Sequence, residues 1–182
     1  CSTMNKKVLI ISSSPRKGGN SETLADAFIR GAKEAGHQTE KICLYDKTIS
    51  FCKGCLACLQ SHRCVIHDDA DVIAQKMRKA DVLVFATPIY YYEMCGQMKT
   101  MLDRANPLYD SDYQFRDVYL LASAAETEKS AMDGAIKGIS GWIECFPNSK
   151  LAGTVFGGGA DVVGAIQGNS ALQEAYELGT KI

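Results

Sequence analysis

The feature that most constrains this chain is an alternation of short apolar runs with segments whose apolar residues repeat at helical spacing. Residues 8–11 and 82–86 are continuous apolar runs rich in β-branched residues, the pattern of strands buried on both faces. Behind them, at 24–35 and 98–105, apolar residues recur every three or four positions. The alternation occurs five times, so it predicts a parallel sheet with right-handed crossovers and helices on both faces.

The length of 182 residues allows one full-sized core and is too short for two ordinary domains and a linker. We therefore expect a single domain over residues 6–182. Residues 1–5 are interpreted as a cloning remnant and a disordered start. A processed lipoprotein would also begin at Cys1, but a remnant before Met4 explains the first three residues better.

Charge and hydropathy exclude several classes of partner. Lys and Arg number 20 against 21 Asp and Glu, which gives a formal net charge of −1, and no long run of one sign occurs. Nucleic acid is therefore not expected as a partner. No stretch approaches the roughly 20 apolar residues of a membrane span, and no signal segment precedes the first strand. We predict a cytoplasmic protein with reduced thiols and no membrane partner.

The loop at 12–23 joins the first buried strand to a helix and is filled with hydroxyls, glycines and one arginine, Arg16. Backbone N–H groups, the helix dipole and the hydroxyls together favour an anion, and a phosphate monoester fits such a loop. The loop follows neither the Walker pattern nor G-x-G-x-x-G. We expect Asn20 or Ser21 to cap the helix. The alternative is an ordinary polar connection.

A second loop, predicted at 87–96, places three consecutive tyrosines after the end of a central strand. Flat, amphipathic ring systems bind against aromatic shelves of this kind. Taken alone, three tyrosines also suit a protein interface or a core patch. Beside a phosphate loop at the same edge of the sheet, they predict half of a nucleotide site.

These segments resemble the flavodoxin-like NAD(P)H-dependent FMN reductases and, within them, the iron-sulfur flavoprotein branch. The matching motifs are S-x-S-P-R-x3-N-S-x-T at 12–23, T-P-I-Y-Y at 87–91, G-Q-M-K at 96–99 and L-D-R at 102–104. The likeness spans roughly residues 6 to 182. It implies a doubly wound, five-stranded sheet of order 2-1-3-4-5, bound FMN, NAD(P)H as electron donor, and a homodimer.

The resemblance also implies site residues. The FMN phosphate would be held by Ser12, Ser14, Arg16, Asn20, Ser21 and Thr23, the ring would be lined by Pro88, Ile89, Tyr90 and Tyr91, and Ser123 and Ala124 would close its other side. Electrons would pass from the nicotinamide through FMN to a small-molecule or protein acceptor. We nominate no protein residue as acid, base or nucleophile. A regulatory FMN-binding module without turnover is an alternative.

Eight cysteines are unusual in a chain too large to need disulfides. Four form the array Cys52-x2-Cys55-x2-Cys58-x5-Cys64, for which three explanations stand: a [4Fe-4S] cluster, a cysteine-rich loop that is metal-free or redox-active, and a zinc site. The array also matches the compact motif of iron-sulfur flavoproteins, which implies an electron carrier with ferredoxin as donor as the alternative function. The cysteines at 43, 95 and 145 are expected to be small buried packing residues.

Overall fold

The computed structural model describes residues 5–182, so of the segment interpreted as a remnant and disordered start only Asn5 is described, and residues 1–4 lie outside the described part. Asn5 Oδ1 accepts a hydrogen bond from Gln38 N at 3.1 Å. The strands are β1 (Lys7–Ser12), β2 (Gln38–Cys43), β3 (Val82–Tyr90), β4 (Glu93–Met94), β5 (Asp117–Ser123) and β6 (Lys150–Gly157). The α-helices are α1 (Asn20–Glu34), α2 (Cys58–Ser61), α3 (Asp69–Lys79), α4 (Gly96–Asp103), α5 (Asp133–Glu144) and α6 (Ala171–Thr180). Short 3-10 helices are η1 (Leu44–Asp46), η2 (Asn106–Leu108) and η3 (Lys129–Met132).

The sheet has the strand order β2-β1-β3-β5-β6, and all four pairings along this path are parallel. Numbered among themselves, these five strands have the flavodoxin-like order 2-1-3-4-5, which confirms the prediction. The sheet formed by the described residues has six strands, one more than the five expected from the sequence. The two-residue strand β4 pairs antiparallel with the end of β3, Ile89 lying opposite Met94.

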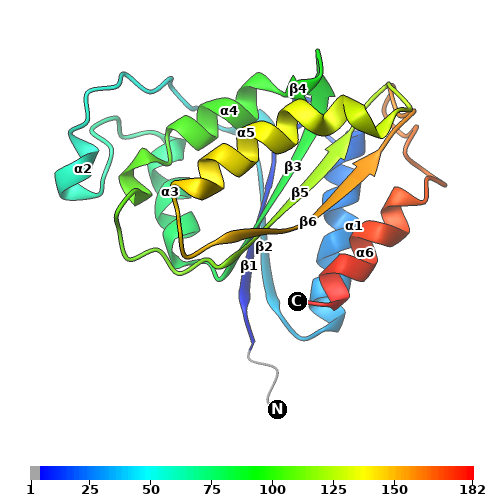
Figure 1. Cartoon of the computed structure of the whole chain (residues 1–182), viewed down its shortest axis with the longest axis horizontal. Coiled ribbons are helices and arrows are strands. Elements are labelled where there is room, and N and C mark those ends of the chain that lie inside the picture. Colours follow the sequence, from blue (N-terminus) through cyan, green and yellow to red (C-terminus); the bar gives the residue numbers. More distant parts are fainter. Residues whose placement is uncertain (1–4) are drawn as a thin grey trace.

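The sheet is covered on both faces, as a doubly wound fold requires. Helices α1 and α6 lie on one face, and α3, α4 and α5 lie on the other (Figure 1). Each face has its own apolar core, and alternate residues of each central strand enter opposite cores. Val8 and Ile10 pack toward α1, whereas Leu9 and Ile11 pack toward α3 and α4. Both sets are nearly inaccessible to water, which explains why the run at 8–11 has no polar residue.

The structure corrects the loop predicted at 87–96. Strand β3 continues through Tyr90, and a two-residue turn then reverses the chain into β4. Both turn residues are in the left-handed region, Tyr91 at φ 51° and Tyr92 at φ 63°. Such a turn suits the twist of a hairpin but is normally built from Asn and Gly, so the sequence carried no ordinary hairpin signal here.

None of the helices formed by residues 5–182 has the length and apolar composition needed to cross a bilayer. The shortest α-helix, α2, lies within the cysteine array and projects from the end of the molecule away from α1 and α6 (Figure 1). It is an element that apolar periodicity did not predict, because none of its residues is buried in the core.

Candidate functional site

The phosphate loop, residues 12–23, leaves the carboxyl end of β1 and enters α1. Ser13 fixes it to the neighbouring strand, since its backbone N–H and its hydroxyl both donate to Ala86 O, at 2.9 and 2.7 Å. The buried Cys95 thiol donates to Ser13 O and approaches Ser13 Oγ, at 3.4 and 3.3 Å. The loop is therefore held against β3 and the start of α4.

Two hydroxyls of the phosphate loop lack a protein partner. Ser12 Oγ and Ser21 Oγ are buried and have no hydrogen bond to any residue between 5 and 182. By contrast, Ser14 Oγ donates to Arg16 O at 3.0 Å and Thr23 Oγ1 donates to Gly19 O at 3.0 Å, so both bonds stay inside the loop. Because a buried polar group without a partner is costly, the two free hydroxyls indicate that a polar ligand belongs here.

The path of the phosphate loop depends on Gly19. A Cβ atom at this position would lie 2.4 Å from Ser14 Oγ and 3.1 Å from Arg16 O. Any larger residue would force the two halves of the loop apart. Gly19, and not Asn20 or Ser21, is the N-cap residue of α1, and no side chain bonds the helix N-terminus. The predicted cap was therefore wrong.

Asn20 and Arg16 tie the phosphate loop to the segment after β6. Asn20 Nδ2 donates to Ala160 O and Val162 O, at 3.3 and 2.9 Å, and its Oδ1 accepts from Ile166 N. Arg16 Nη2 donates to Asp161 O at 2.8 Å. These long-range contacts explain why Asn20 does not cap its own helix. They also leave the roles predicted for Asn20 and Arg16 toward a phosphate as predictions.

An open cleft of about 420 Å³ lies beside the phosphate loop, at the carboxyl ends of β3, β5 and β6. It is lined by Arg16, Pro88, Ile89, Tyr90, Tyr91, Tyr92, Ser123, Ala124, Ala125, Glu126, Ala160 and Asp161. The structure thus brings together the predicted ring-binding residues with one residue of the predicted phosphate set, Arg16. The other five, Ser12, Ser14, Asn20, Ser21 and Thr23, lie in the loop behind it and do not line the cleft.

The tyrosines form the exposed wall of this cleft. Tyr91 is 99% exposed, and Tyr90 and Tyr92 are 42% and 62% exposed. Burial raises the pKa of Tyr90 above its ordinary value. The wall is held from below by Gly134 of α5, where a Cβ atom would lie 2.3 Å from Tyr92 O.

Ser123 and Ala124 form the opposite wall. Ala124 N donates to Gly157 O at 3.0 Å, and Ala160 N donates to Ala124 O at 2.8 Å, so the segments that follow β5 and β6 are joined to each other. Sequence reasoning missed Ala160 and Asp161. The signal that could have found them is topological, because they follow the carboxyl end of a strand next to β5.

These residues fit FMN. One unpartnered hydroxyl, that of Ser12, ends β1, and the other, that of Ser21, lies in the first turn of the fifteen-residue helix α1, where an anion is stabilised by the helix dipole. The adjoining cleft has an aromatic wall and the volume of a ligand site. Bound FMN would supply the hydride-accepting ring, and the chain supplies its binding and orientation.

The four-cysteine array surrounds a second, smaller pocket of about 30 Å³ between α2 and the end of α4. Cys52 and Cys55 are exposed, and Cys58 and Cys64 are half-buried. Within residues 5–182, no group of three or more His, Cys, Asp or Glu side chains is arranged to hold a metal ion. In a four-iron cluster the thiolates surround a volume instead of meeting at one point, and the four cysteines that line this one pocket match such a cluster in number and in ligand type.

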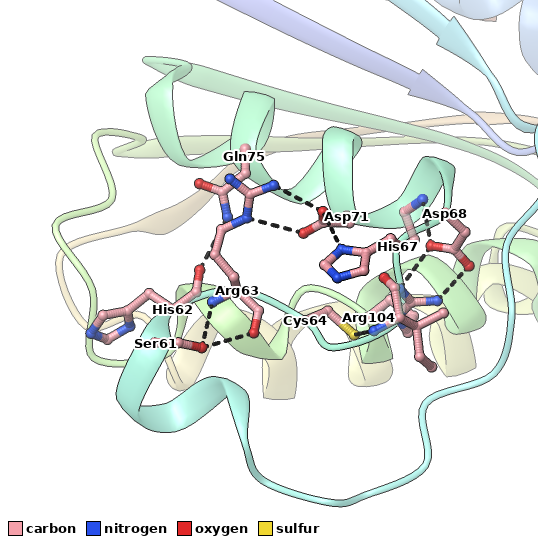
Figure 2. Close-up of polar contacts among 11 residues, drawn as sticks. Ser61, His62, Arg63, Cys64, His67, Asp68, Asp71, Gln75 and Arg104 are labelled. Atoms are coloured by element: carbon pink, nitrogen blue, oxygen red, sulfur yellow. Dashed lines mark hydrogen bonds and ion pairs between the residues drawn. The ribbon is translucent and has the colours of Figure 1, made fainter.

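The cysteine segment, residues 50–68, carries the four-cysteine array, and both of its ends are held by Arg104. The Arg104 side chain is 1% exposed. Its guanidinium donates to both carboxylate oxygens of Asp68 at 2.8 Å, to Ser50 O at 2.8 Å and to Ile66 O at 3.1 Å (Figure 2). Burial opposes ionisation of Asp68, but the hydrogen bonds from Arg104 and from Ser50 N outweigh it and lower the pKa of Asp68 to about 2. Asp68 is also the N-cap of α3, where its side chain accepts from Ala70 N at 3.1 Å.

A second ion pair holds the segment near Cys64. Arg63 Nη2 donates to Asp71 Oδ2 at 2.9 Å, and His67 Nδ1 lies 3.8 Å from the same oxygen (Figure 2). The Arg63 guanidinium lowers the pKa of Asp71, so its carboxylate stays charged. Gln75 Nε2 donates to His62 O at 3.1 Å. The segment is thus anchored to α3 as well as to α4.

Three cysteines outside the array were expected to be buried packing residues. Cys95 is buried, which confirms the prediction for that residue, and Cys43 is only half-buried. Cys145 is exposed at the end of α5, so the prediction was wrong for Cys145. Burial and a hydrogen bond to the Glu22 carboxylate raise the pKa of the Cys43 thiol to about 11.

Comparison with known proteins gives one family. The profile of the family described as NADPH-dependent FMN reductase matches residues 6–173. An iron-sulfur flavoprotein from Methanosarcina thermophila is 30% identical over 175 residues, which cover 96% of this chain and 88% of that protein. A second iron-sulfur flavoprotein, from Archaeoglobus fulgidus, is 37% identical over 101 residues, and the match spans 56% of this chain and about half, 46%, of that relative.

Among solved structures, a NAD(P)H:quinone oxidoreductase from Methanothermobacter marburgensis superposes with a TM-score of 0.73. The superposition covers 97% of this chain and 96% of the other, at 19% sequence identity. At that identity the likeness establishes the fold, and the site must be argued from the residues themselves.

Proposed function

The chain belongs to the NADPH-dependent FMN reductase family, whose members use FMN and NAD(P)H, and we propose that this protein is an oxidoreductase whose FMN occupies the phosphate loop and the adjoining tyrosine-walled cleft. The observation that carries the proposal is the pair of buried hydroxyls, Ser12 Oγ and Ser21 Oγ, without a protein partner. A free hydroxyl in the first turn of a helix, Ser21, and another at the end of the preceding strand, Ser12, suit a phosphate. When bound, FMN accepts hydride from a nicotinamide and passes electrons to an acceptor.

The chain's own residues would bind and orient the flavin. Ser12 and Ser21 would donate to the phosphate, and Arg16, which lines the cleft next to the loop, would bring a positive charge within reach of it. Tyr90 and Tyr91 would cover one side of the ring, and Ser123 and Ala124 would limit the other. No side chain is required as acid, base or nucleophile for hydride transfer.

We propose that a second copy of the chain covers the open side of the cleft. Support comes from the exposed aromatic wall, since Tyr91 is 99% exposed, and from Val162 and Val163, which are also exposed and follow the cleft residue Asp161. Apolar surface of this kind is usually covered in an assembly. The acceptor would be a small molecule or a protein that reaches the ring between the two copies, and the setting would be cytoplasmic.

Flavin titration tests the proposed site. We expect the fluorescence of FMN to be quenched when it binds. Arg16→Ala should weaken FMN affinity about tenfold to a hundredfold, as for a lost hydrogen bond to a charged group. Riboflavin lacks the phosphate, so its affinity should be unchanged by the substitution. Lys17→Ala, next in the loop, is the matched control. Equal losses for FMN and riboflavin would show that Arg16 does not contact the phosphate.

Turnover distinguishes the enzyme from a regulatory module. The holoprotein should oxidise NADH or NADPH in the steady state with a quinone or free FMN as acceptor. Stoichiometric FMN without turnover on either nucleotide would favour a non-catalytic FMN-binding module. A colourless protein without flavin affinity would remove both.

A second candidate function is that of an iron-sulfur electron carrier, favoured by the four cysteines that surround one pocket. Cys52, Cys55, Cys58 and Cys64 would hold a [4Fe-4S] cluster that exchanges electrons with FMN. Anaerobically purified protein should then carry about four irons per chain and absorb broadly near roughly 400 nm. Protein prepared in this way with full FMN and no iron would refute the cluster and leave a metal-free, redox-active array or a zinc site to be tested.

A further inference from the structure

The sulfur atoms of the four-cysteine array accept hydrogen bonds that do not depend on any bound group. Three of the four do so within residues 5–182: Cys52 Sγ accepts from Gly54 N at 3.4 Å, Cys64 Sγ from Ile66 N at 3.4 Å, and Cys58 Sγ from Asn106 Nδ2 at 3.1 Å. The first two donors are backbone groups two residues further along the same segment. The third is a side chain from a different element.

Of the three contacts, only the one between Asn106 and Cys58 depends on the type of residue that supplies the donor. Asn106 begins η2, directly after the end of α4, and lines the cysteine pocket. Its donor reaches the sulfur across 48 positions of sequence and at the shortest of the three distances. A backbone N–H is present whatever the sequence, whereas this donor exists only because residue 106 is an asparagine.

Docking of α2 does not need this contact. The adjacent His62 ring already joins α2 to η2, with Nδ1 3.2 Å from Pro107 O. The carbonyl of His62 is held separately by Gln75 of α3. These two contacts attach the C-terminal end of α2 to η2 and to α3. The main role of the Asn106 amide is therefore its hydrogen bond to the Cys58 sulfur, and not the docking of α2.

Arg104 adds a second buried side-chain donor to the lining of the cysteine pocket. It lines the cysteine pocket two residues before Asn106, and it is buried against Asp68 with Cys64 beside it (Figure 2). Four of its donor contacts are used, but Nε has no hydrogen-bond partner among the described residues. This buried Nε–H lies next to Cys64 and can donate to a sulfur atom at the edge of the pocket, which favours sulfur acceptors there over an apolar occupant.

We propose that Asn106 is a positioning residue for an iron-sulfur cluster in this pocket, where its N–H···S hydrogen bond to Cys58 raises the reduction potential of the cluster. The inference rests on the proposed cluster. Reduction of a bound cluster would add one electron and exchange no atoms, so the total charge of the cluster would become one unit more negative, and part of that charge would lie on the ligand sulfurs. A donor directed at a ligand sulfur stabilises that charge and favours the reduced form.

The test compares the anaerobically reconstituted, FMN-loaded full chain with Asn106→Leu and Asn106→Asp. Leu keeps the approximate volume and removes the donor, and Asp keeps the shape but replaces the N–H group by a charged oxygen. Asn148→Leu, on the exposed surface after α5, is the matched control. The readouts are iron per chain, bound FMN, and the midpoint potential from the electron paramagnetic resonance signal of the reduced cluster.

We expect Asn106→Leu to lower the equilibrium constant for cluster reduction about tenfold or more, a shift of about 59 mV toward negative potential for each factor of ten in a one-electron couple. Asn106→Asp should shift it further in the same direction, and the control should not move it. Selective loss of iron in both variants, with FMN retained and iron retained in the control, would also support a positioning role.

The failure modes are distinct. A wild-type chain that binds FMN but no iron removes the cluster proposal itself. A full complement of iron in Asn106→Leu or Asn106→Asp with the wild-type potential overturns the role of Asn106 and leaves the cluster in place. If the leucine variant does not fold, the potential of the aspartate variant decides alone.

Discussion

The Arg104–Asp68 pair should be a main determinant of stability for the half of the molecule that carries the cysteine segment. The perturbation is Arg104→Met, which keeps an unbranched side chain of similar reach and removes the charge and all donors. Both partners are buried, at 1% and 10% side-chain exposure. The substitution leaves Asp68 without its counter-ion and removes the donors that reach Ser50 O and Ile66 O.

The expected loss in the free energy of unfolding at pH 7 is about 3–5 kcal/mol, the cost of removing one member of a buried ion pair. The pH dependence gives an independent figure. Because the pKa of Asp68 is lowered from 3.8 to about 2, the folded state binds this proton less readily than the unfolded state. The carboxylate thus contributes about 2 kcal/mol that is fully present above pH 4 and disappears as the pH falls toward 2.

Urea unfolding followed by circular dichroism, at fixed saturating FMN, measures both quantities. Arg104→Met should lower the midpoint at pH 7, and Asp68→Asn should reduce the loss of stability between pH 4 and pH 2.5. The control is Arg78→Met, which breaks the exposed pair with Asp112 and should cost at most about 1 kcal/mol. The reasoning is refuted if Arg104→Met costs no more than the control, or if Asp68→Asn keeps the wild-type acid dependence.

Three further predictions concern single positions. Ser21→Ala should stabilise the flavin-free protein by about 1 kcal/mol, since it removes a buried hydroxyl without a partner, and it should weaken FMN binding. Thermal melts should therefore show a higher melting temperature without FMN and a smaller stabilisation by added FMN. A destabilised flavin-free variant would contradict this prediction. Gly134→Ala should lower the free energy of unfolding by about 1–3 kcal/mol, because its Cβ would meet Tyr92 O at 2.3 Å. Gly141→Ala, in open space on the same helix, should raise it by about 0.5–1 kcal/mol in urea unfolding. If both substitutions change the stability in the same direction, α5 can shift to accommodate the added Cβ. Burial and Glu22 raise the pKa of Cys43 to about 11, so its alkylation, followed by mass spectrometry, should accelerate about tenfold per pH unit up to that pH. A plateau near pH 9 would show that neither burial nor Glu22 raises the pKa of this thiol.

Local sequence signals predicted the framework well. Buried strands such as β1 and β3 read as continuous apolar runs because both faces are covered, and the helices that follow show a regular apolar stripe. The parallel order of the five main strands followed from the alternation and the family resemblance. Strand β4 was missed because its turn is built from Tyr91 and Tyr92, which carry no ordinary turn signal.

The candidate site was predicted in its parts and not in its connections. The loop at 12–23 and the tyrosines were located because both follow carboxyl ends of central strands. Asn20 was assigned to the phosphate and to the helix cap, yet its amide bonds the backbone between 160 and 166. These partners lie 140 to 146 positions away, and no local pattern encodes them.

The sequence by itself determined the layered α/β architecture, the family, and which two loops meet at one edge of the sheet, because these follow from periodicity and from motifs within short segments. Only the tertiary structure decided which hydroxyls remain free for a ligand, and which donors face the cysteine sulfurs. Ser12 and Ser21 look like their neighbours in sequence, and Asn106 stands 48 positions from Cys58. A hydrogen bond forms only where donor and acceptor come within a short distance of each other, and that distance is set by the packing of whole elements. The spacing of two residues along the chain does not determine it.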